Sequence, residues 1–394
     1  MNNRQNMIFM MVMMLAILLL TRLIFPQPQQ QKNVKKPDPV KLLEKADKQV
    51  KEGNYKDAFG GFLHPGTYDQ VASNKAFQGT KYGAEALMRK AEAMRTAKGK
   101  FRNERGAIDI YKTVTKQYSD SEDPNIQEYV SAAEREREAL WKQIDKKQSS
   151  QSLYKIVDTM VKSGKSLGLG RYSYAFALLM ITLIIKALTW KLSAIQYKGM
   201  RDMQRVQPLV KEIQGKYKGK PQEVNAKVME TYKKEGVNPL MGCLPMLVQF
   251  PILIFVYKAI LQYEYQFQNG VFLWIGSGLH HKFSFIGANL AQPDIPLVIL
   301  YTISMFITQR LTVVDATQAE QQKIMSIMMP LMFAFFFWKF ASAFLLYWLM
   351  LNIVMTAHQY YVMKAQPVAA VSKTVEAKPS TPTRPAQSRR KRRR

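Results

Sequence analysis

Lys186 is the residue with the clearest capacity for chemistry, because it is the only charged residue in the apolar run Tyr172–Trp190. A run of this length and apolarity is typical of a membrane-spanning helix. A charge within such a helix costs about 2.5–3.5 kcal/mol on insertion scales, so it usually faces water or a partner inside the protein. In surroundings of low dielectric constant, a lysine ammonium attracts acidic groups strongly.

A simpler interpretation is snorkelling, in which Lys186 reaches back to the lipid headgroups near Lys191. Helical side chains, however, lean toward the N-terminus of their helix. If this helix enters from the outside and ends in the cytoplasm, Lys186 leans toward the bilayer centre. The orientation of the chain therefore decides between a functional charge and a snorkelling one.

Six apolar segments form the framework that positions Lys186. Each is a candidate membrane span, and they cover residues 7–25, 172–190, about 242–263, about 295–312, about 324–338 and about 341–362. The first has no small-residue cleavage site, which favours an uncleaved signal anchor over a signal peptide. The last two are joined tightly around Lys339, so we expect them to form a helical hairpin.

The basic residues between the spans predict their orientation. Residues 191–240 contain 11 Lys and Arg and residues 364–394 contain 10, whereas residues 267–294 contain only Lys282. Short cytoplasmic loops carry such an excess, and long translocated segments are exempt from the rule. We therefore expect a multi-pass protein of the plasma membrane, with both termini in the cytoplasm and residues 26–171 outside.

The overall composition predicts neither a cofactor nor a metal site. The chain has 394 residues, a net charge of +28 and 47% hydrophobic residues, which fits apolar spans with basic segments between them. Its one cysteine, Cys243, and its four histidines form no ligand pattern. The SGKS at 163–166 lacks the upstream glycine of a phosphate loop. We expect no bound cofactor and no enzymatic activity.

Residues 38–148 have the pattern of a helical domain. The segment Ala46–Phe62 resembles a tetratricopeptide repeat, and the related pair Ala107 and Tyr111 follows at an offset too long for the repeat period. An irregular repeat-like domain and a plain helical bundle are therefore equal alternatives. The polar, glycine-rich residues 149–170 are expected to be a linker that leads the chain back to the membrane.

Residues 193–236 are expected to form a helical hairpin in the cytoplasm. Its first arm repeats apolar residues in steps of three and four, the spacing of a coiled-coil seam: Met200, Met203, Val206, Val210, Ile213 and Tyr217. Pro221 suits the first position of the second arm, which continues the seam with Val224, Val228 and Tyr232. A solvated face that only sets the topology would explain the charge of this segment but not its seam.

Three motifs lie in and around the predicted spans. They are ITLIIKALTWKLSAIQYKGMRDM (Ile181–Met203), GVNPLMGCLPMLVQFPI (Gly236–Ile252) and KIMSIMMPLMFAFFF with LLYWLMLN (within Lys323–Asn352). In this order they closely resemble the motifs of the YidC/Oxa/Alb-type membrane protein insertase family. The resemblance covers about residues 172–359. The domain at 38–148 does not resemble the large β-sandwich insert of the family, whereas the first span is similar to the anchor of its six-span members.

The resemblance implies a helical bundle with a hydrophilic groove that is open to the cytoplasm and to lipid. Lys186 falls on the position of a groove arginine, so the charge is kept. A lysine lacks the bidentate grip on a carboxylate and, unlike an arginine, can lose its proton. The other groove contacts implied are Thr182, Gln249, Tyr347, Trp348 and Asn352. Gln249 and Asn352 could instead bond neighbouring helices.

The implied function is insertion and folding of nascent integral membrane proteins in the lipid bilayer of the bacterial inner membrane, alone or with a Sec translocon. Residues 363–394 are expected to be a disordered basic tail. Tails of this type can contact the ribosome in the family, and anionic lipid is an alternative partner. The residues that would make these contacts are Arg389, Arg390, Lys391, Arg392, Arg393 and Arg394.

The expected architecture is all-α: an anchor at 1–25, an extracytoplasmic helical domain and linker at 26–171, a five-helix core at 172–362 and the tail. The main alternative function is a transporter or channel that uses Lys186. The spans show no internal repeat of the transporter kind, and no second intramembrane ionisable partner is apparent. A mere anchor for the outer domain would leave Lys186 and the hairpin unexplained.

Overall fold

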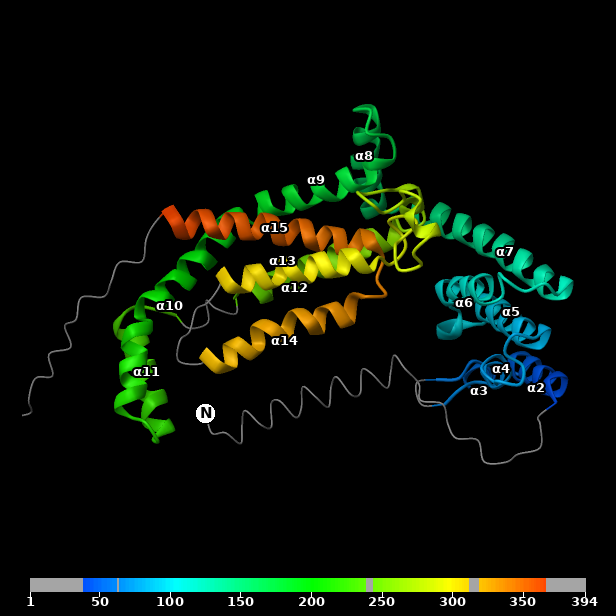
Figure 1. The fold of residues 1–394 in the computed structure, drawn as a ribbon, viewed down its shortest axis with the longest axis horizontal. Coiled ribbons are helices and arrows are strands. Elements are labelled where there is room, and N and C mark those ends of the chain that lie inside the picture. The colour runs from blue at the N-terminus through cyan, green and yellow to red at the C-terminus, as the bar shows by residue number, and fades with distance from the viewer. Residues whose placement is uncertain (1–37, 62–63, 239–243, 312–318, 366–394) are drawn as a thin grey trace, which may run out of the picture.

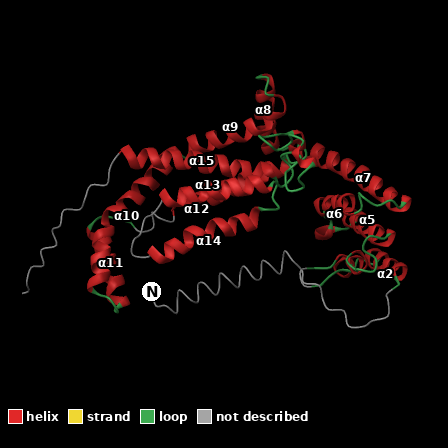
Figure 2. Ribbon diagram, viewed as in Figure 1, coloured by secondary structure: helices red, strands yellow, loops and turns green. Residues whose placement is uncertain are grey.

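The computed structural model describes residues 38–61, 64–238, 244–311 and 319–365. Within these ranges the regular structure is helical, and the two β contacts are isolated bridges, Gly60–Pro65 and Phe272–Ile275. Figure 2 shows helices joined by loops throughout the described part of the chain. The prediction of an all-α fold is confirmed for these residues. The predicted span at 7–25 and the tail from 366 lie outside them.

The N-terminal helices pack largely in the order of the sequence. Their bounds are α2 (Pro39–Lys51), α3 (Tyr55–Phe59), α4 (Thr67–Ala72), α5 (Lys81–Thr96), α6 (Glu104–Gln117) and α7 (Pro124–Gln148). Several of these helices have a side-chain cap at the N-terminus. Asp38, Asn103 and Asp123 each accept a hydrogen bond from a backbone N–H of the first turn. Sequential packing is common to repeat arrays and plain bundles, so both interpretations of this domain stand, and Phe62 lies outside the described residues.

Residues 149–170 contain a helix that the sequence interpretation missed. α8 (Ser152–Ser166) buries Tyr154, Val157 and Val161 and packs against α9 (Ser173–Leu188). At Gly164 the helices approach so closely that an added Cβ would lie 3.0 Å from the Ser173 and Phe176 side chains. The exposed polar residues and nearby glycines hid this amphipathic pattern. The segment is therefore part of the packed core and not a simple linker.

The core is a bundle in which α15 (Ser342–Ala365) packs against α9 and against α13 (Ile295–Leu311). Its side chains and those of α12 (Leu244–Gln262) share one apolar cluster with α8 and α9. Leu345, Leu346 and Tyr347 are fully enclosed there. Figure 1 shows α9, α12, α13 and α15 running along the same direction.

The predicted hairpin of the last two helices is wrong in its packing. α14 (Ala319–Phe337) packs along α13, and α15 also packs along α13. α14 and α15 meet near their joint, where Phe337 lies 5.5 Å from Phe344 between ring centroids. A short connection brings two helix ends together but does not decide which faces pack, and both helices pack along α13. Figure 1 shows α14 diverging from α15 beyond the joint.

α10 (Trp190–Lys216) and α11 (Pro221–Lys234) follow α9 directly. They pack against each other through Val206, Val210 and Tyr232, with Met203 and Val228 beside them. These five residues belong to the seam predicted from the sequence. The first arm begins at Trp190, three residues earlier than predicted, and only Thr189 separates it from α9.

The N-terminal helices are fastened to the end of α12. Arg105 of α6 donates to the Glu264 carboxylate and to the Leu261 carbonyl, and its guanidinium lies 5.5 Å from the centre of the Trp141 ring. Two further side-chain bonds of 2.7 Å join Tyr265 to Glu138 and Gln266 to Asp145. These contacts join the end of α12 and the residues that follow it to α6 and α7.

One described stretch, Gly170–Leu188, is long and apolar enough to cross a membrane. The shorter apolar stretches are Val248–Gln262, Ile295–Gln309 and Ile327–Phe337. They fall within the third, fourth and fifth predicted spans. The six-span topology itself stays a prediction.

Candidate functional site

The junction between α9 and α10 places Lys186 opposite two residues of α10. The Thr189 N–H donates to the Ile185 carbonyl at 3.0 Å, and the Ser193 N–H donates to the Thr189 carbonyl at 2.9 Å. The helical path is thus nearly continuous across Thr189. Residues seven and eleven positions after Lys186 lie on the same face of such a path, and these are Ser193 and Tyr197.

Lys186 is buried, with 3% of its surface exposed. Its Nζ donates to Ser193 Oγ at 3.1 Å and lies 5.4 Å from the centre of the Tyr197 ring, within the range of a cation–π contact. Among the described residues, no carboxylate lies within ion-pair distance of this ammonium. Lys186 is therefore a buried cation that is solvated by a hydroxyl and an aromatic face.

The predicted lean of Lys186 toward the N-terminal end of its helix is wrong. Its ammonium turns the other way, toward Ser193 and Tyr197, because the hydroxyl and the ring supply the polar contacts that the apolar part of α9 lacks. The snorkelling alternative is not supported either, since the side chain is enclosed between helices and does not reach the surface.

His358 of α15 completes this corner of the bundle and was missed as a site residue. Its ring stacks on Trp190, with centroids 3.7 Å apart, and meets the Tyr197 ring edge-on at 5.0 Å. Neither ring nitrogen has a hydrogen-bond partner among the described residues. The expectation that no second ionisable residue of the predicted spans accompanies Lys186 is therefore wrong. The available signal was a single histidine inside the predicted span 341–362.

Thr182 lies one turn before Lys186 and is fully buried. Its hydroxyl donates to the Leu178 carbonyl of its own helix at 2.7 Å. Threonine often satisfies its hydroxyl in this way inside apolar helices. A groove role for Thr182 stays a prediction.

Gln249 lies on α12, and Tyr347 and Trp348 lie on α15, nearer to its start than His358. The Tyr347 hydroxyl faces Gln249 of α12. The hydroxyl, Gln249 Nε2 and Trp348 Nε1 are buried without a hydrogen bond to any described residue. Tyr347 and His358 are separated by about 16 Å along α15 at the helical rise per residue. Gln249 and Tyr347 thus form a second polar group, distinct from the one around Lys186, whereas Trp348 packs against Phe337 and Phe344.

Asn352 ties α15 to α13. Its side-chain oxygen accepts bonds from the Thr308 and Thr356 hydroxyls, and its Nδ2 donates to Ser304 Oγ at 3.3 Å. These contacts match the alternative in which Asn352 bonds neighbouring helices. The six basic residues predicted to contact the ribosome or lipid, 389–394, lie outside the described residues.

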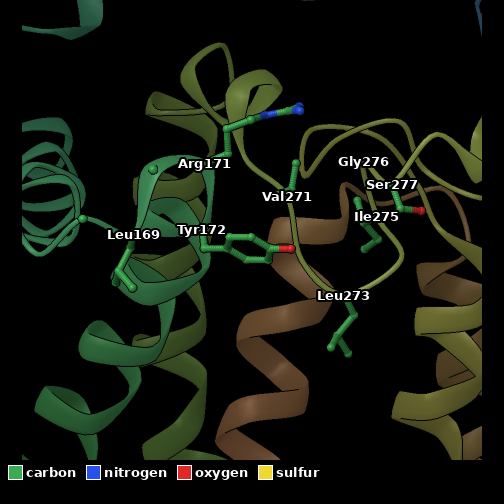
Figure 3. A pocket seen from close by; sticks show the side chains of 10 residues that line it. Leu169, Arg171, Tyr172, Val271, Leu273, Ile275, Gly276 and Ser277 are labelled. Atoms are coloured by element: carbon green, nitrogen blue, oxygen red, sulfur yellow. The ribbon is translucent and has the colours of Figure 1, made fainter.

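A separate cavity of about 410 Å³ lies at the opposite end of α9 from Lys186. Figure 3 shows Tyr172 pointing toward Val271, with Leu273 below them. Arg171 points away from the Tyr172 ring, and its Nε donates to the Asn269 carbonyl at 3.3 Å. In the part of the chain that the structure describes, no cluster of His, Cys, Asp and Glu could hold a metal ion.

The sequence of the core is similar to a known protein family and to named members of it. The family model described as "60Kd inner membrane protein" matches residues 166–369, just over half of the chain. The protein named "Membrane protein insertase YidC" of Pelobacter propionicus is 38% identical over 194 residues, which cover 49% of this chain and 35% of that protein. Its namesake in Wolinella succinogenes is 35% identical over 211 residues, covering 53% and 36%.

The chain spans about a third of the length of these curated relatives. A solved structure, described as an active YidC insertase crystal structure with the first transmembrane domain resolved, is 26% identical, with a TM-score of 0.42. It covers 54% of this chain and 46% of that chain. The family match includes Lys186, Gln249 and His358 but begins after the N-terminal helices.

Proposed function

The chain belongs to the 60Kd inner membrane protein family, to which the YidC insertases belong, and on this premise we propose that it inserts newly made membrane proteins into the lipid bilayer. The observation that carries the proposal is the buried Lys186, which meets no carboxylate among the described residues. A fold retains such a cation at a cost, because burying a charge is unfavourable without a partner. A passing substrate can supply that partner.

The problem that an insertase solves is the passage of polar groups across hydrocarbon. Each unsatisfied polar group in the bilayer core costs several kcal/mol. The two polar groups along α15 offer hydrogen-bonding atoms inside an apolar bundle: those around Lys186 and His358, and those of Gln249 and Tyr347. We propose that these two polar groups line a hydrophilic groove, which shortens the apolar path of a translocated segment.

An exposed apolar face of the bundle supports the same proposal. α13 exposes Ile299, Ile303 and Ile307, each more than half exposed, on one face at four-residue steps. An apolar stripe of this kind is typical of a surface that meets lipid or another apolar helix. A substrate helix that leaves the groove gains about 25 cal/mol for each Å² of apolar surface that it removes from water. This transfer drives release without nucleotide hydrolysis.

The wider arrangement follows from the predicted topology. Both termini and the α10–α11 hairpin lie in the cytoplasm, where nascent chains emerge, and the N-terminal helices lie outside. The basic tail binds ribosomal RNA phosphates or anionic lipid, and a Sec translocon can hand over substrates laterally. The transporter or channel alternative has no support in the family match.

The deciding experiment is depletion of this protein, followed by a protease-protection assay on newly made small membrane proteins. We expect unprotected, uninserted substrate to accumulate, and re-expression of the full chain to restore protection. Normal insertion in depleted cells would sink the proposal. The N-terminal helices have no part in the family match, so a variant that lacks residues 38–148 tests whether the core is sufficient.

A further inference from the structure

His358 is held rigidly by aromatic contacts and yet has unused hydrogen-bonding atoms. Trp190 covers one face of its ring at an interplanar angle of 15°, and Tyr197 packs against its edge at 85°. The Tyr197 hydroxyl donates to the Met355 carbonyl, one turn before His358, at 3.1 Å. The ring is 5% exposed, and neither nitrogen is bonded within the described ranges. A buried polar group of this kind requires a partner.

Lys186 also contacts Tyr197 and also has unused hydrogen-bond donors. An ammonium carries three donors, and one of them reaches Ser193. The Tyr197 ring contacts both residues, at 5.4 Å from Lys186 Nζ and 5.0 Å from the His358 centroid. Three helices, α9, α10 and α15, thus bring two donor groups into contact with one aromatic ring.

We propose that Lys186 and His358 together form a binding site for a carboxylate, namely an Asp or Glu side chain of the segment being translocated. This rests on the proposed insertase function and adds a second recognition group to it. A carboxylate has two oxygen atoms, each with lone pairs to share. One oxygen accepts from the Lys186 ammonium and the other from an imidazole N–H, so both buried donors are satisfied by one ligand.

The chemistry of the surrounding groups selects a carboxylate over an amide. Hydrogen bonds between a charged donor and a charged acceptor are stronger than neutral ones. The Ser193 hydroxyl can also turn to donate to the bound oxygen once the ammonium moves toward it. An Asn or Gln amide offers the Lys186 ammonium only a neutral oxygen, so its hydrogen bond to this cation is weaker than that of a carboxylate.

A second full charge on His358 is not required. Neutral imidazole keeps one N–H donor, and the second nitrogen is an acceptor. The Trp190 face favours the ring in either state, because a neutral ring stacks and a protonated one makes a cation–π contact. The site therefore places one fixed cation and one adaptable donor around the carboxylate.

The test uses the full chain reconstituted in lipid vesicles and two substrates that differ by one Asp→Asn change in the translocated segment. The measured quantity is the ratio of the two insertion rates, acid over amide. His358→Phe keeps the aromatic stack and removes both nitrogens, and we expect it to lower the ratio on the order of tenfold, the loss of one hydrogen bond to a charged group. His358→Gln restores an N–H donor and recovers most of the ratio.

A matched control is Tyr361→Phe on the same helix. Because Tyr361 is 70% exposed, this variant should leave the ratio at the wild-type value. A variant that only damages the fold slows both substrates and leaves the ratio unchanged, and that result for His358→Phe would overturn the proposal. In a double-mutant cycle, Lys186→Met and His358→Phe should be non-additive, because both groups serve one ligand.

A binding measurement separates this proposal from the proposed function. The probe is a fluorescent apolar peptide with one Asp, or with Asn in its place, added to the protein in lipid nanodiscs. Preference for the Asp peptide that disappears in His358→Phe supports the site even if no insertion occurs. Equal binding of the two peptides by the wild-type protein refutes the site, even if insertion proceeds.

Discussion

Replacing Lys186 by methionine should stabilise the core while it impairs the function. Methionine keeps the unbranched stem of lysine, so it leaves no cavity. Removing the buried ammonium relieves a desolvation cost of several kcal/mol. The substitution also removes the 3.1 Å bond to Ser193 and the cation–π interaction with the Tyr197 ring at 5.4 Å. Because these two interactions are worth about 1.5–3 and 0.5–2 kcal/mol, we expect a net stabilisation of about 1–2 kcal/mol.

The assay is thermal unfolding of the purified protein, followed by tryptophan fluorescence. A gain of that size corresponds to a rise in Tm of about 2–8 °C for a domain as large as the core. Lys198→Met is the matched control, because Lys198 is exposed on α10, and it should leave Tm nearly unchanged. A lower Tm for Lys186→Met alone would refute the reasoning, because the ammonium would then be a net stabilising group.

Four further outcomes follow from the same residues. Lys186→Arg should keep the insertion of substrates with acidic translocated segments, whereas Lys186→Ala should slow it at least about tenfold. Equal protease protection for the two variants would show that the charge is dispensable. Arg105→Ala should speed amide hydrogen exchange at residues 261–266, because it leaves the half-buried Glu264 carboxylate without its partner. Unchanged exchange would show that the remaining bonds are enough to hold this segment. Burial raises the pKa of Glu264 above its ordinary value of 4.5, while Arg105 opposes the shift. Because the folded state then binds the proton more tightly than the unfolded state, docking of the N-terminal helices should weaken as pH rises from 4.5 through the raised pKa. Amide hydrogen exchange at residues 261–266 measures this weakening. Truncation after Lys364 should weaken salt-sensitive ribosome binding, and binding that does not change would leave the tail to lipid or topology.

The helices of the core and of the α10–α11 hairpin could be predicted from the sequence because their signals are local. The seam of Val206, Val210 and Tyr232 follows from spacing alone, and the structure buries all three. α8 escaped prediction because the polar and glycine residues around it outweighed a short amphipathic pattern. The partner of α14 escaped it because a tight connection says which helix ends meet, not which faces pack.

The same distinction between local signals and helix packing applies to the candidate site. By itself, the sequence determined that one lysine stands alone in an apolar helix and that its neighbours match the motifs of an insertase family, since composition, spacing and motif order are properties of the chain. Only the tertiary structure decided what this lysine meets. The near-continuous path through Thr189 brings Ser193 and Tyr197 to it, and α15 adds His358 from far along the chain. The physical reason is that a buried charge is defined by its surroundings, and those come from helices whose packing is set by their whole apolar faces.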